Sequence, residues 1–147
     1  MKVFVEQQII QTIHKLLGGR VNEILREMEF SIPLIEIGCD GSNFVVAPAV
    51  ILSSCERTEK ERIIRLDSYS LAVTFEIPDT PESEFYCYAY NHAFCKAINE
   101  NCTLDGLVNR VAVIGKKYIF PRKPYCGGTY GLAITMRLVI EENIYAN

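Results

Sequence analysis

The sequence predicts a single α+β domain, residues 1–147, in which a mixed or antiparallel β-sheet is flanked by an N-terminal helix and a long central helix. Two neighbouring stretches carry this prediction. From Tyr69 to Ile77 apolar residues alternate with small or polar ones, which is typical of a half-buried strand. From residue 82 to residue 99 they recur at three- and four-residue steps, which is typical of a helix. A chain of this length without a repeat or a linker suits one hydrophobic core.

The N-terminal region has a helical stripe of apolar residues that two adjacent glycines interrupt. Gly18 and Gly19 would cost a continuous helix about 2 kcal/mol relative to alanines. We therefore expect one helix over residues 7–17, followed by a second, shorter helix or by a continuation after a kink. The N-terminal helical region is expected to end before Ile32 and Pro33, because the residue before a proline avoids the helical backbone conformation.

Residues 34–61 predict short strands joined by turns. A strand is expected at residues 34–38 and a turn at residues 40–42. Residues 43–52 predict a second strand, in which Pro48 requires an edge position or a bulge because it cannot donate to the ladder. The dense polar stretch at residues 53–61 has two interpretations. It is either a solvated hairpin loop or a projecting arm that makes ion pairs with a neighbouring subunit.

The central unit is a strand, a sharp turn and a helix, and the start of the helix is well marked. Thr80 can cap it, and Pro81 suits the first turn because its missing N–H costs nothing there. Glu82 and Glu84 would lie at the positive end of the helix dipole.

The C-terminal third predicts two more strands. Gly115 indicates a bulge between two parts of one strand. The expected elements are a turn at 105–106, strand segments at 108–114 and 116–120, a loop at 121–130, a strand at 131–141 and a short tail at 144–147.

Charge is segregated along the chain, although the net charge is only −3. Residues 1–105 hold nine Lys or Arg against sixteen Asp or Glu, whereas residues 106–140 hold six basic residues and no acid. If the fold keeps this separation, a basic and an acidic surface result, which suits an anionic partner or copies packed head to tail. Alternatively, the sheet brings the basic strands back beside acidic ones.

The sequence lacks the signs of catalysis, of a cofactor or of a metal. It has no glycine-rich nucleotide loop, no zinc-protease motif and no nucleophile elbow. We expect no metal site at His14 or His92, because neither histidine has a second ligand four residues away, and free, mostly buried thiols, because the cysteines form no C-x-x-C pair. No apolar run approaches the roughly 20 residues of a membrane span, and the first five residues are too short for a signal segment, so a cytoplasmic protein is expected.

A tyrosine-rich and basic surface for single-stranded nucleic acid is a weaker alternative. The residues that would form it are Tyr86, Tyr88, Tyr90, Tyr118, Tyr125 and Tyr130 with Lys116, Lys117, Arg122 and Lys123. The pI of 5.4 and the core-like spacing of Tyr86 and Tyr90 argue against it.

Several stretches resemble a family of small tail proteins of tailed phages and prophage-like elements of Gram-positive bacteria. The resemblance is carried by residues 55–71, 77–84, 86–90, 103–106 and 115–118, and it extends over about residues 34–142. The chain is similar in this respect to tail terminator and tail-to-head joining proteins. The resemblance implies an α+β fold and a structural, non-enzymatic role, with six copies in a ring that caps the tail tube.

The resemblance also implies binding partners and a cellular location. The ring would contact the tail tube protein and offer a surface to sheath and to neck or head-completion proteins, without a membrane or sequence-specific nucleic acid. Assembly would take place in the cytoplasm of the bacterial host, and the product would be a virion or a tail-like particle. The alternative is a small α+β module that binds a ligand or nucleic acid without catalysis.

A ring uses a heterologous interface, and segregated charges provide two unlike patches for it. We expect the arm at residues 53–61 and the turn at residues 81–84 to meet the basic region at residues 116–123 of a neighbour. The residues assigned to this interface are Glu56, Arg57, Glu59, Lys60, Glu82, Glu84, Lys116, Lys117, Arg122 and Lys123.

Overall fold

The computed structural model describes residues 4–36, 48–60, 63–121 and 128–143, and it confirms an α+β domain with an antiparallel sheet. The elements are α1 (Val5–Leu16), η1 (Leu17–Val21), α2 (Asn22–Glu27), β1 (Ala49–Lys60), β2 (Ile64–Pro78), α3 (Ser83–Glu100), β3 (Arg110–Ile119) and β4 (Thr129–Asn143).

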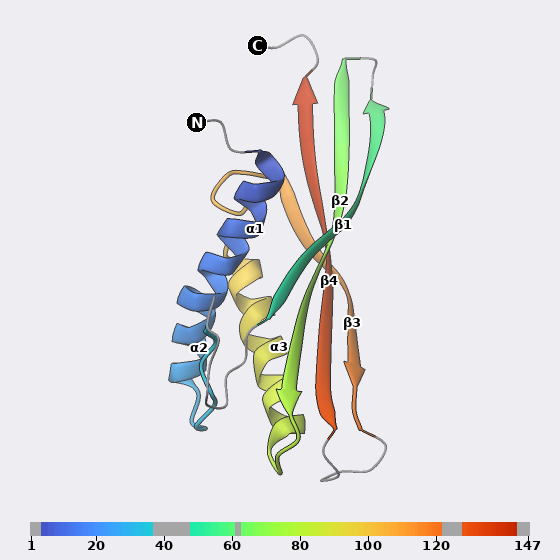
Figure 1. Ribbon diagram of the computed structural model, residues 1–147. Coiled ribbons are helices and arrows are strands. Elements are labelled where there is room, and N and C mark those ends of the chain that lie inside the picture. The colour runs from blue at the N-terminus through green and yellow to red at the C-terminus, as the bar shows by residue number, and fades with distance from the viewer. Residues whose placement is uncertain (1–3, 37–47, 61–62, 122–127, 144–147) are drawn as a thin grey trace.

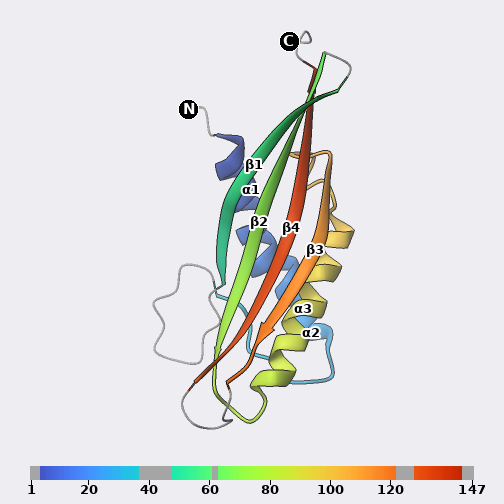
Figure 2. The same ribbon diagram turned by 90° about the vertical axis from the view of Figure 1, so that its right-hand side faces the viewer.

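The four strands form one twisted sheet in the order β1-β2-β4-β3, and every neighbouring pair is antiparallel. The helices all lie against one face of this sheet (Figure 1). Seen from the other side, the strands stand in front and the helices behind them (Figure 2). The sheet therefore has a covered face, an outer face and two edge strands, β1 and β3.

The hydrophobic core lies between the helices and the covered face. The predicted alternation in β2 is confirmed, since Tyr69, Leu71, Val73, Phe75 and Ile77 are all buried. Phe75 stacks on Tyr90 of α3 with 5.5 Å between the ring centroids. The Tyr90 hydroxyl donates to the carbonyl of Pro33 at 2.6 Å, which ties the segment after α2 to the same core.

The two glycines do not end the N-terminal helix. They lie in η1, a single π-helical turn that joins α1 to α2, so the expected continuation is the correct alternative. Asn22 follows this turn and is buried. Its amide donates to the carbonyl of Ile35 and its oxygen accepts the Ile35 N–H, both at 2.8 Å. The side chain thus satisfies two buried backbone groups of a neighbouring segment.

The strand expected at residues 34–38 is limited, among residues 34–36, to a single bridge residue, Ile35, and residues 37–47 lie outside the described part. The solvated loop expected at residues 53–61 is wrong up to residue 60, because β1 continues through it. Its backbone pairs with β2 from Cys55 opposite Tyr69 to Lys60 opposite Ile64. Ladder hydrogen bonds require no apolar side chains, so a polar sequence can form this strand.

The β-bulge predicted at Gly115 is confirmed by a register shift in β3 between Val113 and Gly115. The extra residue reverses which side chains face the helices. Before the bulge Val113 lies opposite buried Met136, and after it Lys116 lies opposite buried Ile134. Directly paired residues share a face of the sheet, so Lys116 faces the helix side and Lys117 the outer side.

The start of α3 differs in detail from the prediction. The N-cap residue is Glu82, and its side chain makes no capping hydrogen bond, so Thr80 is not the cap. Instead the hydroxyl of buried Ser83 accepts the Thr80 N–H at 2.8 Å and donates to the carbonyl of Pro78. This contact fixes the sharp turn between β2 and α3.

Candidate assembly surfaces

The most prominent surface feature is the part of the sheet that extends past the helices, made by residues 55–60 of β1 and residues 63–68, which comprise Ile63 and the start of β2; residues 139–143 of β4 pair with β2 along it. We call residues 55–60 and 63–68 the arm. Its base is marked by Tyr69, whose hydroxyl donates to the Glu6 carboxylate in the first turn of α1 at 3.1 Å. Burial and this hydrogen bond raise the pKa of Tyr69. Beyond Tyr69 the arm projects past the N-terminal end of α1 (Figure 1).

One ion pair braces the arm from within. Arg57 and Asp67 lie opposite each other, with Nε to Oδ1 at 2.7 Å and Nη2 to Oδ2 at 3.0 Å. The hydrogen bond from Arg57 lowers the pKa of Asp67. Arg57 is therefore engaged within its own chain, whereas Glu56 and Glu59 are exposed and make no ion pair with a described residue. Lys60 ends β1.

The edge strand β3 is basic. Arg110, Lys116 and Lys117 are exposed on it, and it contains no acid. Lys116 faces the helix side, where its charge opposes the rise that burial causes in the pKa of Cys95 on α3. Lys117 faces the outer side, opposite Ala133. Because β1 and β3 are the two outermost strands, the arm and this basic strand lie on opposite edges of the sheet.

The structure brings some of the sequence-predicted interface residues together and separates others. Glu82 and Glu84 are exposed at the start of α3, where Tyr88 contacts Tyr118 near the end of β3 at 5.4 Å between ring centroids. These acids therefore lie toward the same end of the molecule as Lys116 and Lys117, and the arm projects at the other end (Figure 1). Arg122 and Lys123 lie outside the described residues.

A surface of exposed or half-buried aromatic side chains lies around the start of α3; the sequence suggested Tyr88 and Tyr118 as part of a tyrosine-rich surface, but not the phenylalanines beside them. We call Phe30, Phe85, Tyr88, Tyr118 and Phe120 the aromatic band. Its rings form two contacting groups: Phe30 with Phe85, whose centroids are 4.8 Å apart, and Tyr88 with Tyr118 and Phe120, where Tyr88 and Phe120 are 6.3 Å apart. Phe30 is 58% exposed and Tyr88 45% exposed. Apolar side chains surround most of the circumference of α3, so the spacing of Phe85 and Tyr88 gave no clear signal that they would be exposed.

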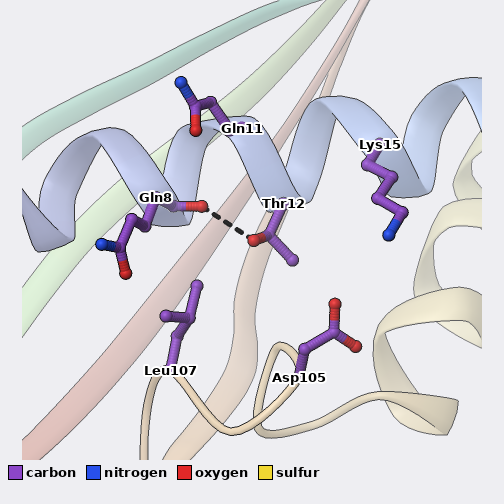
Figure 3. Close-up of a pocket in the computed structure, with 6 residues that line it drawn as sticks. All are labelled: Gln8, Gln11, Thr12, Lys15, Asp105 and Leu107. Atoms are coloured by element: carbon purple, nitrogen blue, oxygen red, sulfur yellow. Dashed lines mark hydrogen bonds between the residues drawn. The ribbon is translucent and has the colours of Figure 1, made fainter. Parts of the chain in front are cut away.

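A hollow of about 360 Å³ lies between α1 and the loop after α3 (Figure 3). Its lining side chains are Gln8, Gln11, Thr12, Lys15, Asp105 and Leu107. The Thr12 hydroxyl donates to the backbone carbonyl of Gln8 at 2.8 Å.

A smaller hollow of about 170 Å³ lies on the outer face of the sheet. Its lining combines Arg137 of β4 with the hydroxyls of Ser54, Ser68 and Ser70 and the carboxylate of Glu56. Arg137 could attract an anion there, but the Glu56 charge at the same site opposes it.

The described part of the chain contains no group of three or more His, Cys, Asp or Glu residues placed to hold a metal ion. None of its helices has the length and apolarity needed to cross a membrane. The described thiols are free, but the expectation that most are buried is wrong: Cys87 is buried, Cys95 is half-buried, and Cys55 and Cys102 are exposed.

Comparison with known proteins adds no assignment to these surfaces, since no protein-family model and no curated protein matches the chain.

Proposed function

We propose that this chain is a structural subunit of a phage or phage-like tail, which assembles with further copies into a ring, of six subunits, that caps the tail tube and joins it to a neck or head. The observation that carries the proposal is the sheet with two unlike edge strands, β1 and β3, each of which pairs on one side only among the described strands. β1 continues into the projecting arm, whereas β3 presents three exposed basic side chains. Two different surfaces on one subunit are what a heterologous interface requires.

The outer face of the sheet supports the same proposal. None of the described helices covers it (Figure 2), and small side chains lie there beside Ile51 and Ile114, each 51% exposed. Unpaired edges and an uncovered sheet face favour association with another chain. A subunit that only assembles with other chains needs surfaces of this kind, and it needs no catalytic group. We therefore propose a structural role without enzymatic activity. The choice of a tail-capping ring as the assembly comes from the sequence resemblance to tail terminator proteins.

The experiment reverses the charge of the basic edge. Lys116→Glu with Lys117→Glu is expected to abolish rings seen by electron microscopy of the concentrated protein, and to give tails of abnormal length in a particle-producing host. The melting temperature should change little because both side chains are exposed. Lys15→Glu with Lys96→Glu, two exposed lysines of the helix layer, is the matched control and should leave rings intact.

Two outcomes would contradict the proposal. One is a particle whose tails keep their normal length when this chain is deleted. The other is the absence of density for this chain at the end of the tube that lies opposite the baseplate.

The second candidate is a module that binds nucleic acid, and the observation in its favour is the basic outer face near β3. Arg110 and Lys117 share that face with Arg137 of β4, judged from their pairing. Titration with a single-stranded oligonucleotide at low and moderate salt separates the candidates, because binding through phosphates weakens steeply as salt rises. Tight, salt-sensitive binding together with the absence of rings would favour this module over the tail protein.

A further inference from the structure

A groove of about 480 Å³ runs between the segment after α2 and the first half of α3. Met28 and Phe30 line it from the first side, and Phe85 and Tyr88 line it from the second. The rings of Phe30 and Phe85 meet edge to face, with 4.8 Å between their centroids. Phe30 is 58% exposed and Tyr88 45% exposed, because no described segment fills the groove. A contiguous apolar surface of this kind is typical of a site that binds another protein chain.

The two stretches of chain that border the groove, residues 27–36 and 79–95, carry a one-sided charge. They contain six acids and no lysine or arginine. The acids are Glu27, Glu29, Glu36, Asp79, Glu82 and Glu84. The bases nearest to these stretches in the sequence, Arg26 and Lys96, are exposed and do not line the groove. The chain on both sides of the groove is therefore acidic.

Three of these carboxylates belong to the groove and its margin. Glu27 and Glu29 are among the lining residues. Glu84 accepts a hydrogen bond from the Tyr88 hydroxyl at 2.9 Å, which places its carboxylate beside the aromatic lining. Neither Glu29 nor Glu84 makes an ion pair with a described residue. The groove thus combines an apolar lining with a negative margin.

The base that contacts this margin is shared among several acids. Arg20 lies 3.7 Å from Glu27, measured from Nη1 to Oε1. The same guanidinium lies 3.2 Å from Glu23 and 2.8 Å from Glu100. One positive charge therefore faces three carboxylates, and the margin retains a net negative charge that an incoming cation would neutralise.

An arginine side chain matches both properties of the groove. Its planar guanidinium stacks on aromatic rings and donates paired hydrogen bonds to carboxylates, whereas the compact ammonium of lysine has no planar face. The groove is also larger than one side chain, which leaves room for aliphatic neighbours against the rings. We propose that the groove binds an arginine-bearing segment of a partner protein, in which aliphatic residues flank the arginine. This inference goes beyond the proposed function and does not depend on it, because the partner is not another copy of this chain.

Isothermal titration calorimetry of the full chain at pH 8, where an ordinary imidazole is neutral, measures this binding. The probe is a short acetylated and amidated peptide that carries two arginines, each between leucines. It should bind with a dissociation constant below about 1 mM, and the same peptide with glutamine in place of arginine should bind about tenfold more weakly.

Three results with the peptides would contradict the proposal. The absence of binding at about 1 mM would overturn it outright. Equal binding of the glutamine peptide would show that the groove selects no cation. Equal binding of a lysine peptide would overturn the choice of arginine.

A pair of charge variants locates the binding. Glu29→Gln with Glu84→Gln should weaken binding of the arginine peptide about fivefold, because both carboxylates lie at the groove. Glu56→Gln with Glu59→Gln removes the same charge from exposed positions of the arm and is the matched control. If the control weakens binding as much as the groove pair does, the peptide is attracted by the overall charge of the protein, and the inference is wrong.

A pair of aromatic variants tests the lining. Phe30→Ala should weaken binding about tenfold, because it removes a ring on which the guanidinium stacks. Phe4→Ala, at a 74% exposed phenylalanine outside the groove, is the control and should bind the peptide like the wild type. Should Phe30→Ala fail to fold, Phe85→Ala replaces it, because Phe85 lines the same groove. A folded groove variant that binds the peptide with unchanged affinity overturns the inference.

Two further measurements test other occupants. Tetramethylammonium that displaces the arginine peptide at equal concentration would indicate a site for a small cation instead of a protein segment. Self-association that is lost in Phe30→Ala but kept in Phe4→Ala, measured by sedimentation velocity, would assign the groove to a second copy of this chain. Either result would overturn the inference and leave the proposed ring standing, since the ring is tested separately at Lys116 and Lys117.

Discussion

The arm and the covered part of the sheet belong to the same strands, yet different forces hold them. From Tyr69 to Ile77, β2 buries every second side chain under the helices. From Ile64 to Ser68 it continues with half-buried side chains, strand pairing and one ion pair between Arg57 and Asp67. The covered part is thus stabilised by burial of apolar surface, and the arm by backbone hydrogen bonds that add little net stability in water.

This difference assigns separate tasks to the two regions. Burial of roughly 25 cal/mol per Å² makes the covered part the source of the fold's stability. Side chains of the arm can change at small cost to that stability, which leaves them available for contacts with other molecules.

The largest effect should come from two neighbouring residues that face opposite sides of β2. Phe75→Ala removes a ring that contacts both Tyr90 and Phe94, and it should lower the free energy of unfolding by about 3–5 kcal/mol. Thr74→Ala changes the outer face and should cost no more than about 0.5 kcal/mol. Urea titration followed by circular dichroism measures both. Equal losses would show that the outer face is packed as tightly as the core.

A somewhat smaller effect is expected for Asn22, which secures the helix layer rather than the sheet. Asn22→Ala leaves the buried N–H and carbonyl of Ile35 without their partner, at a cost of about 2 kcal/mol. Asn99→Ala, at an exposed position of α3, is the matched control and should be nearly neutral. A neutral Asn22→Ala would mean that water replaces the amide, so that residue 35 is less secluded than its 3% exposure indicates.

The sequence predicted the strand in the covered part of the sheet but not the strand in the arm, because only the covered part has a buried face. Alternation between Tyr69 and Ile77 arises because one face is buried and the other is not. Residues 55–59 are all exposed, so their side chains carry no period, and the ladder that makes them a strand depends on backbone atoms that every residue has.

The exposure of the aromatic band could not be predicted from the sequence for a related reason. Phe85 and Tyr88 are apolar residues on a helix whose apolar side chains surround most of its circumference, so the periodicity alone could not indicate which of them the sheet would cover. The glycine pair was ambiguous in a different way. Gly18 and Gly19 favour a break in isolation, but buried residues on both sides, Leu17 and Val21, hold the helix together through η1.

A smaller effect on stability is expected when the ion pair between Arg57 and Asp67 in the arm is removed. The folded-state pKa of Asp67 lies below its ordinary value of 3.8 because Arg57 donates to it, so the unfolded chain binds this proton more tightly. The stabilising contribution is complete above the ordinary pKa and is lost as the pH falls through the lowered one. Asp67→Asn should therefore lower the melting temperature slightly near pH 6, and the difference from the wild type should vanish in acid below the lowered pKa.

Glu59→Gln controls for the general effect of removing an acid from the arm, because Glu59 makes no ion pair with a described residue. A difference between wild type and Asp67→Asn that persists unchanged in acid would mean that packing, rather than charge, supports Asp67.

The smallest effect involves no change in stability and compares the thiols of the two regions directly. Cys55 is exposed in the arm, whereas Cys87 is buried on α3, where burial raises its pKa to about 11. Brief alkylation of the folded protein near pH 8, followed by peptide mass spectrometry, should modify Cys55 and leave Cys87 intact, although burial and the Asp67 charge also raise the pKa of Cys55. Cys87 should react fully after unfolding in denaturant. Because a thiol that is both buried and protonated reacts only when its surroundings open, modification of Cys87 as fast as Cys55 would show that α3 separates readily from the sheet, and that the covered part is no more stable than the arm.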